Sequence, residues 1–400
     1  MASSSLSLLR QVLAWAVEQG MSVRGQLTEE QLAALERACS GTEPWSFEHY
    51  LPLRAFGDAL SRLDLPDLPA HLSFGDVLQA FDELRAGTLE PWPTHTAVSA
   101  ASFAELGYAS TSAAITRVRD TNAASWREHG LNNKQLLLKG AELASGSRAV
   151  VVGAGNLYDI PLRKLAERFE QLLLVDIDPD AMAESVKGAD LEPSLQARLT
   201  LVQADVTGIN DTFLTRAHAA LALTDELEVC AALLRVLHEY YVEEPPRLLP
   251  ESVTGPLDFA CSSMVLSQLA TPLTRYVEAQ LAARFPASRH AQTHEFQVAL
   301  GQLTHRVQQA HVRSLLAAAP FIALTSDVSE QYTTLDARGI LMEGVSRLPL
   351  IGAPSLAALI PRQLASCVLG AEWQWRHVVP TRGKPQGRTV QVAGVVAQRR

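Results

Sequence analysis

The run Arg148-Ala-Val-Val-Val-Gly-Ala-Gly-Asn156 constrains the fold of this chain more than any other segment. Its apolar residues predict a buried strand, and Gly153 and Gly155 predict a tight turn directly after it. Glycine permits such a turn and lets backbone N–H groups approach a ligand closely. A second apolar strand, at residues 171–178, carries Asp176 at its end. The order of strand, glycine turn, helix and acid-tipped strand predicts a nucleoside-binding α/β unit in which Asp176 accepts hydrogen bonds from a ribose.

The dinucleotide-binding turn Gly-x-Gly-x-x-Gly has a third glycine, and Tyr158 stands at that position here. The missing glycine normally gives close helix–strand packing and room for a pyrophosphate. Asp159 follows at the expected start of a helix, where a carboxylate disfavours an anion and suits a cationic or amino-acid ligand. An NAD-dependent oxidoreductase is therefore kept as an alternative hypothesis, and a different adenosine-containing cofactor is favoured.

A third strand is expected at residues 199–205, where an alternating pattern ends in Asp205 and is followed by Val206. Here the sequence resembles the class I S-adenosylmethionine-dependent methyltransferases. Their signature is a glycine turn after the first strand, an acid ending the second strand and an acid just after the third. The resemblance covers about residues 125–400 and departs from the family at its third glycine, which is Leu157 in this chain.

The resemblance implies an α/β fold with a doubly wound, seven-stranded Rossmann-like sheet that closes with a C-terminal antiparallel hairpin. It also implies S-adenosyl-L-methionine as the cofactor. The glycines would lie beside its methionine moiety, Asp176 at the ribose hydroxyls, and Asp205 with Val206 at the adenine. The residues expected to bind the cofactor are Gly153, Ala154, Gly155, Asn156, Asp159, Asp176, Ile177, Asp205, Val206 and Ser262.

The remaining strands agree with this fold. Residues 257–268 predict a strand that reaches Ser262 and Ser263 and then runs into a helix, and a fifth strand is expected at 320–327. Residues 372–397 read as two strands around a turn that contains glycine and proline. A closing antiparallel strand is typical of the methyltransferase sheet, so this hairpin argues further against a dinucleotide domain.

Methyl transfer from a sulfonium depends on alignment and on removal of water, so no catalytic triad is expected. A general base would help if the acceptor were an alcohol or a protonated amine. The candidates for a catalytic role are His311, Ser262 and Ser263, although a structural role is favoured for His311. His290 and His294 have a spacing that can bind a metal, but a helix surface explains them without a ligand, and no metal is expected.

Charge and missing motifs indicate the class of acceptor. The formal net charge of −9 opposes a large nucleic-acid footprint. Cys261 lacks the Pro-Cys context of cytosine-5 methyltransferases, and the strand end at Ser263 lacks the Asn/Asp-Pro-Pro-aromatic turn of adenine-N6 methyltransferases. We therefore expect methylation of an oxygen or nitrogen on a small molecule, with no nucleic-acid partner. A protein or peptide acceptor stays open, and so does a non-catalytic binding or regulatory relative.

Proline-marked breaks suggest three parts, which are an N-terminal helical accessory domain at 1–92, a bridging or lid segment at 93–147 and a methyltransferase-like catalytic domain at 148–400. A helical insertion is expected at about 207–256, with one long helix from 211 to 241. This insertion would serve as a substrate cap or as the interface of a homodimer.

The bridging segment and the whole chain support two further expectations. Tyr108, Trp126 and Arg127 would either cover the cofactor or pack against the core. No segment is apolar for long enough to span a membrane, and the first residues lack the pattern of a secretory signal. The scattered cysteines indicate reduced thiols, so we expect a cytoplasmic protein with no membrane partner.

Overall fold

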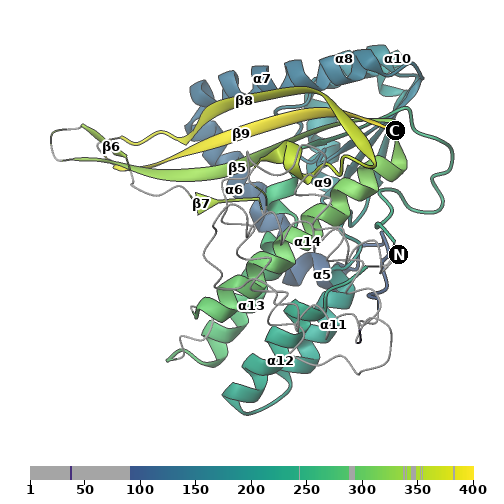
Figure 1. Cartoon of the computed structure of the whole chain (residues 1–400). Coiled ribbons are helices and arrows are strands. Elements are labelled where there is room, and N and C mark those ends of the chain that lie inside the picture. The colour runs from purple at the N-terminus through teal and green to yellow at the C-terminus, as the bar shows by residue number, and fades with distance from the viewer. Residues whose placement is uncertain are drawn as a thin grey trace, which may run out of the picture.

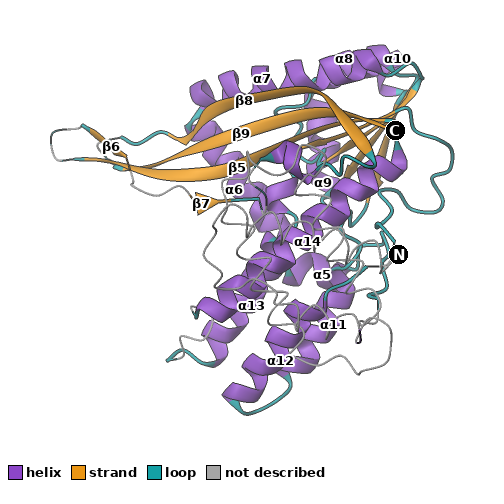
Figure 2. Ribbon diagram, viewed as in Figure 1, coloured by secondary structure: helices purple, strands orange, loops and turns teal. Residues whose placement is uncertain are grey.

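The computed structural model describes residue 37 and residues 91–400, apart from 243, 288–292, 337, 339, 344–347, 352, 354 and 382. The N-terminal helical domain expected at 1–92 therefore lies almost entirely outside the described residues. Over the described residues, the molecule is built around one twisted sheet with helices on both faces (Figures 1 and 2).

Five strands of the sheet are parallel, and the last two close it as an antiparallel hairpin. The strand order is β3-β2-β1-β4-β5-β9-β8, with β9 inserted antiparallel between β5 and β8. This arrangement confirms the fold class that the sequence predicts. The strands are β1 (Arg148–Val152), β2 (Gln171–Asp176), β3 (Leu199–Gln203), β4 (Phe259–Ser263), β5 (Phe321–Leu335), β8 (Ala365–Val378) and β9 (Gln386–Arg399).

The central strands are continuously apolar because helices cover both of their faces. Residues 149–152 of β1 and 172–175 of β2 are fully buried. Two separate hydrophobic cores flank the sheet. One core packs against α7 (Ala123–Leu143), α8 (Leu162–Arg168) and α9 (Pro179–Gly188), with the short α10 (Pro193–Gln196) beside α8. The other packs against α11 (Asn210–Leu221), α12 (Glu226–Glu239), α13 (Thr271–Arg284) and α14 (His294–Ala318).

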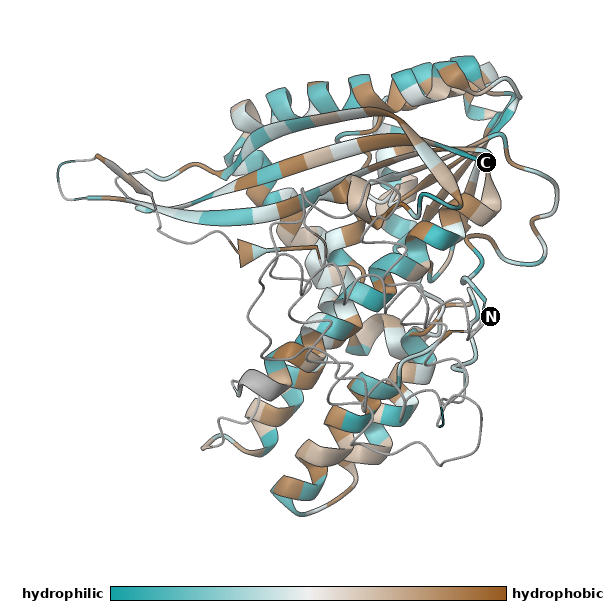
Figure 3. Cartoon of the chain, viewed as in Figure 1, coloured by the Kyte–Doolittle hydropathy of each residue, from teal (hydrophilic) through white to brown (hydrophobic). Residues whose placement is uncertain are grey.

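The strand β5 is longer than the sequence predicts, and its second half projects beyond the end of β4. A bulge between Asp327 and Ser329 marks the start of this extension. Two short strands that were not predicted, β6 (Leu341–Glu343) and β7 (Leu348–Pro349), pair with it. Hydropathy changes along the same strands. The first half of β5 and the second half of β9, which lie next to the C-terminus of the chain, are mostly hydrophobic. The opposite ends of both strands are mostly polar (Figure 3).

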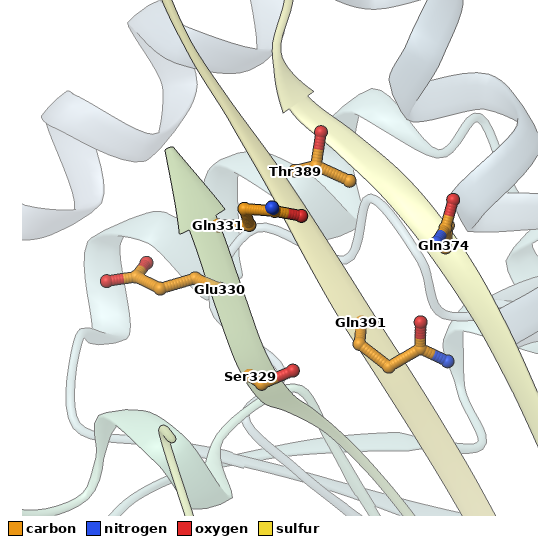
Figure 4. A pocket seen from close by; sticks show the side chains of 6 residues that line it. All are labelled: Ser329, Glu330, Gln331, Gln374, Thr389 and Gln391. Atoms are coloured by element: carbon orange, nitrogen blue, oxygen red, sulfur yellow. The ribbon is translucent and has the colours of Figure 1, made fainter. Parts of the chain in front are cut away.

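A shallow polar hollow lies on the extension and spans about 200 Å³ of space, open solvent included. Its walls come from β5, β8 and β9, so uncharged amides and hydroxyls of three neighbouring strands gather there (Figure 4). Glu330 points away from the glutamines, as expected for alternating side chains of a strand. The lining residues are Ser329, Glu330, Gln331, Gln374, Thr389 and Gln391.

The connections differ from the sequence-based expectation in one place. The single helix predicted from 211 to 241 is wrong, because the chain forms α11 and α12 with a break between them. Asp225 lies just before α12 and accepts hydrogen bonds from the backbone N–H groups of Leu227 (2.9 Å) and Glu228 (3.1 Å), so it caps a new helix. Pattern alone does not distinguish one long helix from two helices with the same apolar face.

The bridging segment is helical and precedes β1. It contains α5 (Ala100–Glu105) and α6 (Tyr108–Thr121), and then α7, which ends shortly before β1. Two 3₁₀ turns complete the described elements, at Leu266–Gln268 after β4 and at Leu356–Leu359 before β8. Among the described helices, none combines the length and the apolar character needed to cross a membrane.

Candidate active site

The glycine turn after β1 is held tightly against its neighbours. Gly153 has a φ of 80°, and a Cβ added there would lie 1.9 Å from Cγ2 of Val265. The backbone N–H of Gly155 donates a 2.8 Å hydrogen bond to Oδ2 of Asp176. A Cβ on Gly155 would lie only 3.2 Å from that same oxygen. Gly153 is therefore required by its backbone conformation and by close packing, and a side chain on Gly155 would crowd the acid.

Two residues near this turn adopt left-handed backbone conformations without being glycine. Leu157 has a φ of 50°, and Met264, which directly follows β4, has a φ of 56°. Such conformations are unfavourable for large side chains and cluster at functional sites. Leu157 thus has a left-handed backbone conformation that a glycine would adopt freely.

Asp176 is the half-buried last residue of β2. Its Oδ2 accepts from Gly155, and its Oδ1 accepts from the backbone N–H of Asp178 (3.0 Å). Burial raises the pKa of Asp176, while these backbone donors oppose that rise. Ala154 is fully buried, and Ile177, like Asn156 in the turn, is half-buried beside this carboxylate.

Asp205 is 3% exposed and is already committed to the protein itself. Its Oδ1 accepts from the backbone N–H (2.9 Å) and the hydroxyl (2.6 Å) of Thr207, and its Oδ2 accepts from the N–H of Asn210 (2.9 Å). Burial raises its pKa against these donors. Asp205 therefore caps the start of α11, and its backbone N–H donates to the carbonyl of Thr96 (3.0 Å). Val206 next to it is half-buried.

The bridging segment lies over these two acids. The carboxamide of Asn210 donates a 2.9 Å hydrogen bond to the Tyr108 hydroxyl. Burial raises the pKa of Tyr108, and the nearby charges of Asp205 and Asp176 raise it further. The ring of Phe103 stacks on Tyr108 with 5.9 Å between centroids. Tyr108 thus lies close to both acids that the sequence places at the cofactor.

A second polar group joins α7 to the ends of β1 and β4. Asn133, fully buried on α7, donates through Nδ2 to Oγ of Ser263 (2.8 Å) and to both the carbonyl (3.0 Å) and Oδ2 (3.2 Å) of Asp159. Ser263 donates in turn to Oδ2 of Asp159 (2.8 Å). The sequence singles out Asp159 and Ser263, and it misses Asn133, since α7 precedes every motif and carries no signature of its own.

The structure separates the three residues considered for catalysis. Ser262 lies on the opposite face of β4 from Ser263, as expected for neighbouring residues of a strand. Its Oγ lies 2.9 Å from Nε2 of His311, and both side chains are buried. Burial lowers the pKa of His311 to about 4, so the imidazole is neutral at pH 7. Only Ser263 accompanies Asp159, and the catalytic roles remain predictions.

An aromatic cluster covers the sheet beside this group. The His129 ring stacks on Trp375 at 3.9 Å, and Trp126 meets Trp375 edge-on at 4.6 Å. Trp373 donates a hydrogen bond to Nδ1 of His129 (3.1 Å), and Trp126 donates to the carbonyl of His377 (3.2 Å). Burial lowers the pKa of His129 to about 4 and that of His377 to about 3. Trp126 therefore packs from α7 against β8.

Two of the sequence-based alternatives concern other side chains. The Cys261 thiol is fully buried in β4, and burial raises its pKa, which opposes a role as a nucleophile. His290 lies outside the described residues, and the side chain of His294 is not described. Over the side chains that are described, no three His, Cys, Asp or Glu residues come together as metal ligands.

No family model and no curated protein matches this sequence. The structure is similar to that of the N-methyltransferase NodS from Bradyrhizobium japonicum, with 9% identity and a TM-score of 0.31 over 69% of this chain and 97% of that chain. It is also similar to a putative RNA methyltransferase from Pyrococcus horikoshii, with 5% identity and a TM-score of 0.32 over 67% and 84% of the two chains. A third similar structure is that of the glycopeptide N-methyltransferase MtfA, solved with S-adenosylmethionine. It has 10% identity and a TM-score of 0.27 over 65% of this chain and 92% of that chain.

The chain's own sheet identifies the fold. Its strand order, with five parallel strands and an antiparallel β9 between β5 and β8, is the arrangement that distinguishes the methyltransferase sheet from dinucleotide-binding domains. The described part of this chain thus has the Rossmann-like fold of the class I S-adenosylmethionine-dependent methyltransferases.

Proposed function

We propose that this protein is an S-adenosylmethionine-dependent methyltransferase that methylates an oxygen or nitrogen of a small molecule. The observation that supports this proposal best is the contact between the Gly155 N–H and Asp176. It brings the glycine turn and the acid of β2 together at the carboxyl edge of a sheet with the methyltransferase strand order. Ligands of such open α/β sheets bind beyond this edge.

The residues at this edge fit the proposed cofactor. A Cβ would clash at Gly153 and would crowd the Asp176 carboxylate at Gly155, so the turn presents bare backbone beside this carboxylate. Asp176 is half-buried and keeps acceptor capacity for ribose hydroxyls beyond its two backbone donors. When bound, S-adenosylmethionine supplies a sulfonium-activated methyl group. The protein's part is to bind the cofactor, to align the acceptor with it and to exclude water.

The bridging segment contributes to the exclusion of water. Tyr108 contacts Asn210 at the start of α11, and the Tyr158 hydroxyl lies 3.0 Å from Oγ1 of Thr116 in α6. The Arg119 guanidinium lies 4.2 Å from the centre of the Tyr158 ring. These contacts hold α6 over the glycine turn and the two acids, which supports a role of this segment as a cover for the cofactor.

The preference for a small acceptor is supported by the overall charge. A net charge of −9 opposes a large contact with a phosphate backbone. The strand end Cys261-Ser262-Ser263-Met264 also lacks the motifs by which the base-modifying enzymes hold a nucleobase. A protein or peptide acceptor would be found by testing such acceptors alongside small amines and alcohols.

The function is tested by calorimetric titration of the protein with S-adenosylmethionine, S-adenosylhomocysteine and NAD in parallel. Micromolar binding of the first two ligands and none of NAD is expected. Binding of NAD alone would overturn the proposal and support an oxidoreductase. Binding of the two adenosyl ligands without turnover on any acceptor would instead support a non-catalytic relative.

Asp176→Ala tests the position of the ribose site. We expect S-adenosylhomocysteine to bind about 10- to 100-fold more weakly, because hydrogen bonds to a charged group contribute about 1.5–3 kcal/mol. Asp180→Ala is the matched control, since Asp180 is an exposed acid in the first turn of α9. Unchanged affinity in Asp176→Ala would place the ribose elsewhere.

A further inference from the structure

The extension formed by β5, β9 and β8 carries different side chains on its two faces. On one face, Trp375 and Val390 belong to a small apolar cluster, and Glu330 forms an ion pair with Arg388 beside it. The other face forms the shallow hollow described above. Because side chains alternate along a strand, Arg388 and Thr389 serve opposite faces. The hollow is therefore lined by the uncharged side chains of these strands, and Glu330 points away from its glutamines (Figure 4).

The side chains of the hollow are aligned across three strands. Gln391 of β9 lies opposite Ser329 of β5 on one side and opposite Gln374 of β8 on the other. Two residues earlier in β9, Thr389 lies opposite Gln331. Side chains that face each other across antiparallel strands have Cβ atoms about 5 Å apart, and the next pair on the same face follows about 7 Å along the strand. The hollow thus presents a regular array of amides and hydroxyls.

Most of these polar groups are not used by the protein itself. Over the described residues, no side-chain hydrogen bond or ion pair is formed by Ser329, Gln374, Thr389 or Gln391. Ser329, Thr389 and Gln391 are nevertheless half-buried, and Gln374 is exposed on the edge strand β8. Their donors and acceptors are therefore left to solvent or to a ligand.

The chemistry of this array favours a neutral ligand that is rich in hydroxyl groups. Carboxamides and hydroxyls each donate and accept, and so does a ligand hydroxyl, so the two sets match without a fixed polarity. Among the described residues that line the hollow, no charged side chain points into it, so nothing there offsets the desolvation of an ionic ligand. A peptide strand finds no free backbone edge at its centre, because β9 already pairs with β5 and with β8.

We propose that the hollow binds a neutral carbohydrate, with Gln391 at its centre and Ser329 and Gln374 on either side. Hydroxyl groups at opposite positions of a sugar ring are separated by a distance similar to that between paired side chains, so one ring can bridge two strands. This site goes beyond the proposed methyl transfer, since its lining residues belong neither to the glycine turn nor to the acids Asp176 and Asp205.

Saturation-transfer NMR on the full chain tests the proposal. The probes are the methyl glycosides of glucose, galactose, mannose and xylose, with N-methylacetamide as a neutral probe for peptide groups. We expect at least one glycoside to bind saturably and N-methylacetamide to show no saturable binding. Gln391→Ala should weaken the binding of that glycoside at least about 5-fold, because the substitution removes a carboxamide that can both donate and accept.

Gln398→Ala is the matched control. Gln398 is also a glutamine of β9, but it is exposed near the C-terminus and does not line the hollow. Its substitution should leave the dissociation constant of the glycoside within about 2-fold. Gln374→Ala is the second variant, because Gln374 is exposed on an edge strand and its loss should leave the fold intact. It should weaken the same glycoside at least about 3-fold.

Weakening in Gln391→Ala and Gln374→Ala, with the control unchanged, supports the carbohydrate site. Lack of saturable binding by every glycoside overturns it, and the hollow is then an ordinary hydrated face of the sheet. Equal weakening in Gln398→Ala, or unchanged binding in all three variants, places the carbohydrate elsewhere and also overturns the proposal. Saturable binding of N-methylacetamide with similar affinity would indicate a peptide ligand instead. If Gln391→Ala does not fold, Gln374→Ala still decides.

Discussion

At the scale of single residues, burial changes the chemistry of side chains that look reactive in the sequence. Ser262 and His311 are close enough for a hydrogen bond, yet both lie within the core on the α14 side of the sheet. Ser263 faces α7, where it contacts Asn133 and Asp159. Which serine accompanies the acid depends on the direction of a side chain from a strand, and the sequence pattern of β4 alone does not distinguish the two faces.

His311 should make the stability depend on pH. Its pKa is about 4 in the folded protein and near the ordinary value of about 6.5 when unfolded, so only the unfolded chain binds a proton between these values. The contribution of the neutral imidazole to the free energy of unfolding is complete above pH 6.5. It is lost as the pH falls toward 4, by about 1.4 kcal/mol for each pH unit.

The variant His311→Gln should therefore lose stability less steeply than the wild type between pH 6 and pH 4.5. Glutamine can still hydrogen-bond to Ser262, and it does not titrate. Urea unfolding across this range gives the free energy of unfolding of each protein as a function of pH. The slopes of the two curves should differ by an amount that corresponds to nearly one proton taken up on unfolding. Parallel curves would show that the imidazole is not neutral and buried in the folded state.

At the scale of elements, two helical glycines have opposite roles. A Cβ on Gly140 in α7 would lie 3.1 Å from Cβ of Ala323 and 3.2 Å from the Phe259 ring, so this glycine lets α7 pack closely on the sheet. A Cβ on Gly301 in α14 would meet nothing within 4 Å. The helical pattern in the sequence is similar at both positions, and only the packing partner differs.

Gly301→Ala should raise the free energy of unfolding by about 0.5–1 kcal/mol, because alanine has the higher helix propensity and finds open space. Gly140→Ala should lower it by about 1–3 kcal/mol, since the added methyl group overpacks the contact between α7 and the sheet. Chemical denaturation of the two variants measures both values. Destabilisation of similar size in both would mean that α14 is packed where the structure shows it open.

At the scale of the whole molecule, the candidate site is assembled from segments far apart in the chain. The turn after β1, the ends of β2 and β4, the start of α11 and the bridging segment all meet at one edge of the sheet. The segment at 100–121 reaches this edge through Tyr108 and through the contact between Thr116 and Tyr158. Binding at the edge should therefore restrain a segment that precedes every motif.

Hydrogen exchange measured by mass spectrometry tests this arrangement. With saturating S-adenosylhomocysteine, backbone amides of α5 and α6 should exchange more slowly, because the bound ligand stabilises the closed position of a cover with few buried contacts. Peptides from α12, which packs against α11 and α14, are the internal control and should change less. Equal protection in both regions would argue against a local cover.

Much of the fold could be predicted before any tertiary contact was known. The apolar strands, Gly153 and Gly155, and Asp176 and Asp205 carry strong local signals, because a buried parallel strand and a tight turn each need particular residue types. The C-terminal hairpin was also predictable, although β8 and β9 are longer than expected, since pairing with neighbours extends strands beyond their most apolar residues. The break between α11 and α12 and the strands β6 and β7 had weaker signals.

The contacts that define the site had to come from the folded molecule. Nothing in the sequence marks Asn133 as buried beside Asp159 and Ser263, since its burial and its contacts arise when α7 packs against β4. Likewise, Asp205 looks like a ligand residue in the sequence, and in the structure its carboxylate caps α11. Local patterns specify backbone conformation and burial, whereas hydrogen-bond partners depend on which distant segments meet, and that is set by packing of the complete chain.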